Sequence, residues 1–281
     1  MNSNIKNFSF QGVRGAYSEI AGNKIYPEAK SMACKTFEEV FEVVRKEKVE
    51  RAVVPIENSL SGRVADTQRL IPNSGLKIIG EYFLEIQHCL LAGFSASLKT
   101  IKRVHSHEQA LAQCREYLIL NNISMNIAAD TAGSAKEISK LNNSEDAAIA
   151  SKLAAEIYGL KILQENVQDI VNNFTRFVVM GKNLIPIDPK EKGIMSTIVY
   201  QVRSIPAALY KSLGGFATNS VNITKLESYV HPQGFDVAQF YIDFEGHPDI
   251  ASVKLAVEEM KFFCEEINVL GVYKASAFRK K

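Results

Sequence analysis

The residues best suited to chemistry lie in the segment Asn172-Asn173-Phe174-Thr175-Arg176-Phe177-Val178-Val179-Met180, where polar side chains lead into a β-branched and aromatic strand. Side chains alternate between the two faces of a strand, so Thr175 and Arg176 face opposite sides and only one of them can meet a ligand. An arginine in this setting is usually part of a structural ion pair. Thr175 is therefore the better candidate for ligand contact.

A second polar segment follows a predicted buried strand at 51–55 and contains Glu57, Asn58 and Ser59. A helix that starts near Gly62 would need only one of these side chains as a cap. The surplus of polar groups favours ligand contact over capping alone.

A third segment, His105-Ser106-His107-Glu108-Gln109-Ala110-Leu111-Ala112-Gln113-Cys114, opens a predicted helix. Alternating histidines at a strand end share a face, but no third ligand has suitable spacing, so we predict no metal site. Ser106 as the helix N-cap is the structural alternative to a ligand contact. Gln109 and Gln113 lie four residues apart on one helical face, which faces either a cleft or solvent.

Two more segments place backbone N–H groups and hydroxyls at predicted helix starts. Gln11-Gly12-Val13-Arg14-Gly15-Ala16-Tyr17-Ser18-Glu19 contains a glycine turn but not GxGxxG, so a dinucleotide is not expected. Asp130-Thr131-Ala132-Gly133-Ser134-Ala135 follows a predicted strand, and Asp130 is either a helix cap or a ligand contact. Together the five segments predict a site of neutral donors at carboxyl strand ends. Such a site suits a small carboxylate and requires no cofactor.

The elements that must position this site alternate between strand and helix before residue 181, which favours a mostly parallel α/β sheet in two lobes around a cleft. The predicted strands are 8–11, 51–55, 78–84, 89–92, 101–105, 123–129 and 147–150, with helices at 17–26 and 36–46. Residues 181–193 hold two prolines, two glycines and a charge cluster, which is typical of a linker. After the linker, strands at 197–202, 222–230, 236–244 and 269–274 and helices at 205–216 and 248–266 predict a βαββαβ, ferredoxin-like domain.

Composition narrows the function classes for this chain of 281 residues. Its formal net charge of +2 gives no electrostatic case for nucleic-acid binding. No apolar run reaches the roughly 18–20 residues that span a bilayer, and residues 1–7 lack a signal-peptide pattern, so no membrane partner is expected. Cys34, Cys89, Cys114 and Cys264 form no close pair, and we expect a reduced, cytoplasmic protein.

These motifs resemble those of the prephenate dehydratase family, in the family's order and over nearly the whole chain. The matching segments are the glycine turn with Ala-Tyr-Ser-Glu at 16–19, Pro-Ile-Glu-Asn-Ser at 55–59, Ser-His-x-Gln-Ala at 106–110, Asp-Thr-Ala-Gly-Ser-Ala at 130–135 and Asn-Phe-Thr-Arg-Phe at 173–177. The tail resembles an ACT regulatory domain through Asn222-Ile223-Thr224-Lys225-Leu226-Glu227-Ser228.

The resemblance implies a bilobal catalytic domain like the type II periplasmic binding proteins, followed by the ACT domain. The catalytic domain would cover 1–182, with one lobe at 8–80 plus 166–182 and the other at 81–165, and the ACT domain would cover 194–281. Copies of the chain are expected to pair through their ACT domains as a homodimer or homotetramer.

The resemblance further implies conversion of prephenate to phenylpyruvate, water and carbon dioxide in phenylalanine biosynthesis, without a cofactor or metal. It assigns Thr175 as the main catalytic residue, beside the departing hydroxyl, and Glu57 as a proton source if burial raises its pKa. The residues expected to bind substrate are Asn58, Ser59, Ser106, Gln113, Thr131, Gly133, Ser134 and Phe177.

The ACT resemblance implies feedback by L-phenylalanine. The residues expected to bind it at an interface between ACT domains are Ala208, Leu209, Asn222, Ile223, Leu226, Glu227 and Ser228. Where the family usually has Arg-Pro after Glu-Ser, this chain has Tyr229-Val230, which leaves the strength of the feedback open.

Three alternatives stay open at this point. An arogenate dehydratase would use the amino analogue of prephenate, and the Gln-Gly-Val-x-Gly-Ala-Tyr-Ser-Glu form of the first motif also resembles those enzymes. A non-catalytic binding module would use the two-lobed fold as a receptor or sensor of small carboxylates, although the sequence has no secretion signal or helix-turn-helix pattern. A metabolite sensor that works only through its ACT domain leaves the five polar strand ends unexplained.

Overall fold

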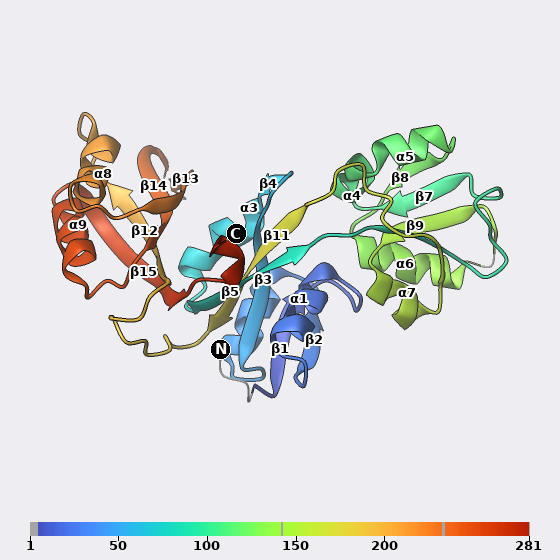
Figure 1. Cartoon of the computed structure of the whole chain (residues 1–281), viewed down its shortest axis with the longest axis horizontal. Helices are drawn as coiled ribbons and strands as arrows, with labels where there is room; N and C mark the ends of the chain where they lie inside the picture. The colour runs from blue at the N-terminus through green and yellow to red at the C-terminus, as the bar shows by residue number, and fades with distance from the viewer. Residues whose placement is uncertain (1–4, 142, 232–233, 281) are drawn as a thin grey trace. The chain divides into compact units, whose positions relative to one another are not determined.

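The structure is a computed structural model that describes residues 5–141, 143–231 and 234–280, with 229–231, 234–237 and 280 described by their backbone only. Figure 1 shows the course of the chain. The chain forms two compact units: unit 1 comprises Asp66–Glu81 and Val178–Lys281, and unit 2 comprises Asn2–Ala65 and Tyr82–Phe177. The predicted domain bounds at 182 and 194 stay a prediction.

The first sheet of unit 2 is built around β1 (Asn7–Gln11), which runs parallel to β2 (Lys30–Cys34) and to β3 (Arg51–Asn58). The helices α1 (Tyr17–Ile25) and α2 (Phe37–Arg45) belong to this part (Figure 1). In α2 the Thr36 side chain accepts from Glu39 N and caps the helix. The buried face of α2 carries Val40, Phe41, Val43 and Val44, the apolar spacing from which the helix is predicted.

The second sheet of unit 2 has the strand order β10-β6-β9-β7-β8. Its strands are β6 (Cys89–Ala92), β7 (Arg103–Ser106), β8 (Ser124–Ile127), β9 (Asp146–Ala150) and β10 (Lys161–Gln164), and its helices are α4 (Glu108–Gln113), α5 (Arg115–Leu120), α6 (Thr131–Lys140) and α7 (Lys152–Tyr158). The central strand β9 is buried throughout. Ala147 and Ile149 join one apolar cluster while Ala148 and Ala150 join another, so both faces of this sheet are covered.

The end of β3 departs from the predicted arrangement. The helix predicted to start near Gly62 begins later in the chain, because β4 (Gly62–Arg63) folds back antiparallel onto β3, with Gly62 opposite Asn58. Gly62 has a φ of +76°, which a glycine adopts without strain. The helix α3 (Ala65–Leu70) begins three residues later. The strand that lies next to β3 in the sheet, on the side away from β1, is β11 (Phe174–Gly181).

Unit 1 contains the predicted βαββαβ arrangement, which is confirmed. It consists of β12 (Ile194–Val202), α8 (Ala208–Thr218), β13 (Ile223–His231), β14 (Gly234–Glu245), α9 (Ala251–Lys261) and β15 (Cys264–Lys274). The sheet is antiparallel, with β12 between β14 and β15. The last helix is shorter than predicted, since Cys264 already belongs to β15. Pro232 and Gln233 of the predicted hairpin turn lie outside the described residues.

The rest of unit 1 packs around β5 (Lys77–Glu85), which follows α3 and the short 3₁₀ helix η1 (Ile71–Asn73). β15 runs parallel to β5, and Lys77 Nζ donates to Val269 O at 2.6 Å. The buried Glu81 receives two hydrogen bonds from Arg279, at 2.6 and 2.9 Å, within the C-terminal 3₁₀ helix η2 (Ala277–Lys280). The predicted fold class, an α/β bilobal domain followed by a ferredoxin-like domain, is therefore confirmed.

Within the described ranges, no helix combines the length and the apolar character needed to cross a bilayer. All four cysteines are buried and free of disulfides. The cytoplasmic location stays a prediction.

Candidate active site

Thr175 and Asn58 meet where β11 begins and β3 ends. The Asn58 Nδ2 atom lies 2.9 Å from Thr175 Oγ1. Two hydrogen bonds hold the strand ends together: Ser59 N donates to Phe174 O at 2.8 Å, and Phe174 N donates to Ser59 Oγ at 2.9 Å. Thr175 is buried, Asn58 is half-buried and Ser59 is exposed, so the cluster reaches solvent at this edge.

The direction of the Asn58–Thr175 hydrogen bond follows from the backbone. Asn58 Oδ1 accepts from Leu60 N at 3.0 Å and from Ser61 N at 2.9 Å. A backbone N–H can only donate, so this end of the amide is the oxygen and the other end is the donor. Thr175 Oγ1 therefore accepts from Asn58. Among the described residues the Thr175 hydroxyl donates to no protein acceptor, which leaves its proton for a ligand.

The hydrogen-bond network continues away from Thr175 through side chains that are distant in sequence. Asn58 Nδ2 also donates to Asn173 Oδ1 at 2.6 Å, and Asn173 Nδ2 donates to Gln113 Oε1 at 3.0 Å. Gln113 Oε1 lies 2.9 Å from His88 Nε2, and His88 Nδ1 lies 2.7 Å from the Tyr17 hydroxyl. We call these six residues the Tyr17–Thr175 network. Gln113 is a predicted site residue, whereas Tyr17, His88 and Asn173 are not in the predicted set.

Burial fixes the charge of the two titratable members of the Tyr17–Thr175 network. It lowers the pKa of His88, against a smaller opposite effect of the hydrogen bond to Gln113. It also raises the pKa of Tyr17, with further increases from the nearby thiols of Cys89 and Cys114. Near neutral pH, His88 is a neutral imidazole and Tyr17 keeps its proton.

Glu57 and Arg176 form an ion pair on the other side of the same two strands. Arg176 Nη1 lies 3.0 Å from Glu57 Oε1, and the Arg176 side chain is 1% exposed against 31% for Glu57. Because neighbouring residues of a strand face opposite ways, Glu57 and Arg176 share one face and Asn58 and Thr175 share the other. The expected ion pair of Arg176 is thus present. The proton-source role of Glu57 stays a prediction.

Ser106 and the histidines beside it have structural partners. The Ser106 hydroxyl is buried and donates to Ile149 O at 2.7 Å. The helix α4 is capped by His107, whose ring accepts from Gln109 N, so Ser106 is not the N-cap that was the alternative to ligand contact, and its substrate-binding role stays a prediction. His105 Nε2 lies 2.9 Å from Asp146 Oδ1. In the part of the chain that the structure describes, no three His, Cys, Asp or Glu side chains gather as metal ligands.

The predicted segment at the start of α6 shows a helix cap. Asp130 Oδ1 accepts from Gly133 N at 2.6 Å, and Ser134 Oγ donates to Asp130 O at 2.8 Å. A Cβ atom at Gly133 would lie 2.7 Å from Asp130 Oδ2, so a larger residue there would displace the capping carboxylate. Thr131 beside them is half-buried, and Phe177 is buried in the core. None of these residues hydrogen-bonds to the Tyr17–Thr175 network within the described ranges, and their substrate-binding roles stay predictions.

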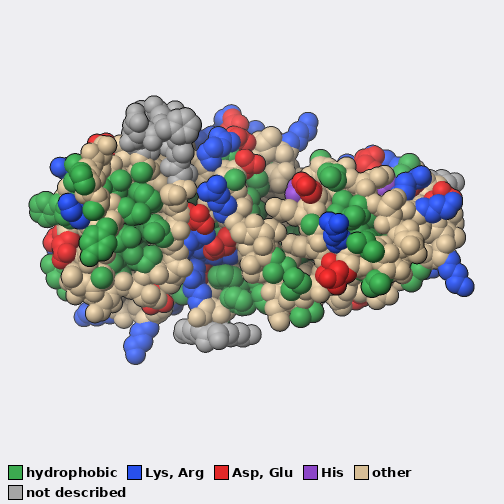
Figure 2. All heavy atoms as spheres, turned by 90° about the horizontal axis from the view of Figure 1, so that it is seen from above, with side chains coloured by type: hydrophobic (Ala, Val, Ile, Leu, Met, Phe, Trp, Pro, Cys, Tyr) green, Lys and Arg blue, Asp and Glu red, His purple; other side chains and the backbone are tan. Residues whose placement is uncertain are grey.

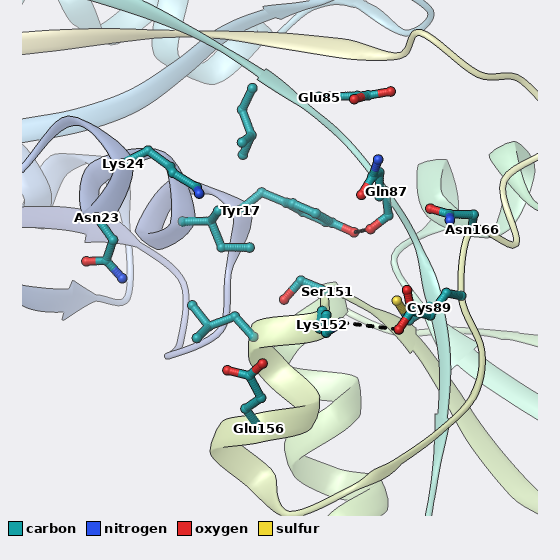
Figure 3. A pocket seen from close by; sticks show the side chains of 14 residues that line it. Tyr17, Asn23, Lys24, Glu85, Gln87, Cys89, Ser151, Lys152, Glu156 and Asn166 are labelled. Atoms are coloured by element: carbon teal, nitrogen blue, oxygen red, sulfur yellow. Dashed lines mark hydrogen bonds and ion pairs between the residues drawn. The ribbon is translucent and has the colours of Figure 1, made fainter. Parts of the chain in front are cut away.

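A cavity of about 540 Å³ lies in unit 2 next to the far end of the Tyr17–Thr175 network (Figure 3). Thr175 and Glu57 do not line it. In Figure 3 the Tyr17 ring points toward Gln87, whose carbonyl oxygen is 2.8 Å from the Tyr17 hydroxyl. The residues around the cavity are Tyr17, Ile20, Asn23, Lys24, Leu84, Glu85, Gln87, Cys89, Ser151, Lys152, Leu153, Glu156, Glu165 and Asn166.

The predicted effector residues all belong to unit 1. Ala208 and Leu209 begin α8, Asn222 precedes β13, and Ile223, Leu226, Glu227 and Ser228 lie on β13. Leu226 is 42% exposed, and Glu227 pairs with Lys225 at 3.2 Å. The side chains of Tyr229 and Val230 lie outside the described residues.

Comparisons with known proteins agree with the motifs. A family model described as prephenate dehydratase matches residues 8–184. The bifunctional N-acyl-homoserine lactone acylase/prephenate dehydratase of Komagataeibacter europaeus is 41% identical over 97% of this chain and 97% of that protein. The arogenate dehydratase/prephenate dehydratase 2 of Arabidopsis thaliana is 39% identical over 94% of this chain and 72% of that protein.

A solved structure supports the same relationship. The prephenate dehydratase of Arthrobacter aurescens in complex with L-Phe has a TM-score of 0.88 and 28% identity, over 97% of this chain and 91% of that one. With more than half of its length matched by the family model and relatives near 40% identity, this chain belongs to the prephenate dehydratase family of hydro-lyases in phenylalanine biosynthesis.

Proposed function

We propose that this enzyme converts prephenate to phenylpyruvate, with the Thr175 hydroxyl donating to the hydroxyl group that leaves. The observation that carries the proposal is the direction of the Asn58–Thr175 hydrogen bond. Because Thr175 Oγ1 accepts from Asn58 Nδ2, the threonine proton is turned toward a ligand.

The reaction needs few protein groups. The bond between the ring and its carboxylate breaks and releases carbon dioxide, and its electron pair enters the ring. The ring becomes aromatic as the C–O bond on its opposite side breaks, and the departing hydroxide takes up one proton to become water. A threonine hydroxyl does not ionise near neutral pH. Thr175 therefore shares its proton with the leaving oxygen in the transition state, and solvent supplies the proton that is consumed.

Substrate binding uses neutral donors that suit a dicarboxylate. Gln113 Nε2 donates to Ser61 Oγ at 3.2 Å and keeps a second N–H, for which the described residues offer no acceptor. Ser59 is exposed just after the end of β3. Hydrogen bonds from such donors to a carboxylate are charge-assisted, so they are stronger than those between neutral groups.

L-Phenylalanine is the proposed effector of the ferredoxin-like domain, on the basis of the Arthrobacter structure that contains it. Binding at Ala208, Leu209 and the segment 222–228 would shift the equilibrium between active and inactive states. We propose pairing of this domain between copies, as a homodimer or homotetramer. Figure 2 shows apolar side chains gathered on one face of this part of unit 1. The exposed large apolar side chains of the ferredoxin-like domain are Ile205, Tyr210, Leu226, Leu255 and Phe262.

Arogenate is the alternative substrate, because the Arabidopsis relative is named for both activities. Prephenate and arogenate differ only in a keto group and an amino group on the side chain, away from the C–O bond that breaks. The Thr175 step is the same for both. Comparing kcat/KM for the two substrates decides between them.

A second activity, hydrolysis of N-acyl-homoserine lactones, is a candidate because the Komagataeibacter relative carries it in its name and aligns over the full length. The cavity beside Tyr17 has apolar walls at Ile20, Leu84 and Leu153 that suit an acyl chain. Its Cys89 thiol has a pKa raised by burial, so it is not an activated nucleophile. The test is release of fatty acid from an acyl-homoserine lactone by the purified protein.

The experiment for the main proposal incubates purified protein with prephenate, with and without L-phenylalanine, and follows the alkaline absorbance of phenylpyruvate. We expect product that accumulates with time and more slowly with the effector. Complete lack of product from both prephenate and arogenate would favour a non-catalytic sensor of small carboxylates.

A further inference from the structure

We propose that His88 and Tyr17 are positioning residues for the dehydration: together they hold the Gln113 amide with its nitrogen toward the substrate. The inference rests on the proposed function and extends it to two side chains outside the predicted set. It comes from the directions of five consecutive hydrogen bonds in the Tyr17–Thr175 network.

The directions can be read from one fixed end of the network. Asn58 Oδ1 accepts from two backbone N–H groups, so Asn58 Nδ2 must donate, and the atom of Asn173 that it meets at 2.6 Å must be the oxygen. The other end of the Asn173 amide is then a donor. It meets Gln113 at 3.0 Å, so that atom of Gln113 must be Oε1.

The same reasoning fixes the tautomer of His88. Gln113 Oε1 can only accept, so His88 Nε2, at 2.9 Å, must carry a hydrogen. A neutral ring then has a lone pair on Nδ1, 2.7 Å from the Tyr17 hydroxyl, whose single hydrogen is shared between His88 Nδ1 and Gln87 O, at 2.8 Å. The Tyr17 ring stands edge-on to the His88 ring, with centroids 5.5 Å apart, and this contact holds the imidazole in place.

These hydrogen bonds fix the orientation of the Gln113 side-chain amide. Two donors, His88 Nε2 and Asn173 Nδ2, converge on Oε1 and hold the oxygen inward. The Nε2 group then points the other way, to Ser61 Oγ, with its second N–H available. If the amide turned by half a rotation, Oε1 would face the substrate, and an oxygen beside a carboxylate repels it. His88 and Asn173 thus together keep the Gln113 N–H, rather than its oxygen, on the side of the anionic substrate.

The backbone around His88 is also tied to the site. Ile86 N donates to Asn173 O at 2.7 Å, and His88 N donates to the Gln168 side chain at 2.9 Å. The His88 side chain is 2% exposed, so solvent does not compete for its ring nitrogens. The segment between β5 and β6 therefore holds the imidazole at a constant distance from Gln113.

The test measures KM and kcat for prephenate in His88→Met and His88→Gln. Methionine fills the space without a donor, so we expect KM to rise about ten-fold or more, as for a lost hydrogen bond that serves a charged ligand. Glutamine can place an N–H near the position of His88 Nε2 and should keep KM within about three-fold of wild type. The matched control is His105→Gln, another histidine of unit 2 with a side-chain partner, which should leave KM unchanged.

A double-mutant cycle separates positioning from a general structural effect. In a Gln113→Met background the amide is absent, so His88→Met should raise KM no further. Equal fold-changes in KM in both backgrounds, or a wild-type KM in His88→Met, would overturn the inference.

Tyr17→Phe is the second variant, which removes the hydroxyl that lies 2.7 Å from His88 Nδ1 and 2.8 Å from Gln87 O. We expect KM to rise about three-fold, the lower range for a neutral hydrogen bond. Tyr158→Phe, which removes a hydroxyl bonded to Arg14 O at 2.8 Å, is its control. An unchanged KM in Tyr17→Phe contradicts the inference.

Absence of turnover in the wild type contradicts the proposed function instead, and the wild-type assay alone identifies that failure.

Discussion

Asn58 and Thr175, 117 positions apart in the chain, share a hydrogen bond of 2.9 Å whose direction is set by the backbone N–H groups of Leu60 and Ser61. The threonine oxygen accepts, so its proton is left for a ligand. A polar loop at the end of one strand thereby determines what a hydroxyl on another strand can do. This relationship connects the fold directly to the proposed chemistry.

Changing Asn58→Asp should reverse that direction. A carboxylate has no hydrogen to donate, so the Thr175 hydroxyl would turn inward and donate to the introduced carboxylate instead of the substrate. We expect kcat to fall about 10²-fold, as when one donor to a developing charge is lost. The control is Asn126→Asp, which adds the same charge at an exposed position of β8. Turnover within about three-fold of wild type in Asn58→Asp would contradict the assigned direction.

Glu57→Gln distinguishes an ion-pair partner from a proton donor. Glutamine keeps an acceptor for Arg176 but cannot supply an acidic proton. Since Glu57 and Arg176 lie on the face opposite Thr175, we expect kcat to stay within about five-fold and stability to fall by about 1–2 kcal/mol. Urea unfolding and initial rates give the two quantities. A loss of about 10²-fold in kcat with unchanged stability would instead identify Glu57 as the general acid.

Asp146 makes the stability of unit 2 depend on pH. The hydrogen bonds from Arg103, at 2.8 Å each, are the largest cause that lowers the pKa of Asp146, and bonds from His105 and Asn143 add to it against the cost of burial. A pKa lowered by folding stabilises the protein above the unfolded value of about 3.9, and this contribution is lost as the pH falls below it.

The measurement for Asp146 compares Asp146→Asn with wild type by urea unfolding between pH 7 and pH 2.5. The variant should be less stable by about 1–3 kcal/mol at pH 7. The gap should narrow as the pH falls from about 5 toward 2.5. A gap that stays constant over this range would show that the charge of Asp146 does not contribute.

Asn222→Ala tests the proposed effector site. Asn222 is exposed just before β13, and its carbonyl oxygen accepts from Glu245 N, a bond that the alanine variant keeps. Loss of the side-chain amide should weaken binding of L-phenylalanine by about ten-fold. The measured quantity is the L-phenylalanine concentration that halves the rate of Asn222→Ala, divided by the concentration that halves the rate of the wild type. An unchanged ratio would place the effector elsewhere.

Local patterns were sufficient for most of the fold, and their failures have physical causes. α2 and β9 follow from apolar spacing alone. β2 was not predicted because it is an edge strand and mostly exposed, so its sequence lacks alternation. The predicted helix 248–266 is longer than α9, because the apolar residues that suggest a helix continue past Lys261. In the folded chain Cys264 instead pairs with Val202 on β12, and this pairing makes the segment a strand.

The candidate site was only partly accessible from sequence. The polar residues at the ends of β3 and β11 mark Asn58 and Thr175, because such a surplus is unusual after a buried strand. His88 carries no local signal, since a single histidine between two strands has many ordinary explanations. Its partners Tyr17 and Gln113 are 71 and 25 residues away, and only the folded chain brings them together.

The most direct measurement of the central claim compares the rate of phenylpyruvate formation from prephenate in wild type, Thr175→Ser and Thr175→Val under identical conditions. Serine keeps the hydroxyl next to Asn58 and should retain turnover within about ten-fold. Valine has nearly the shape of threonine without the hydroxyl and should lose about 10²-fold or more in kcat. Near wild-type turnover in Thr175→Val would contradict the role of the Thr175 proton.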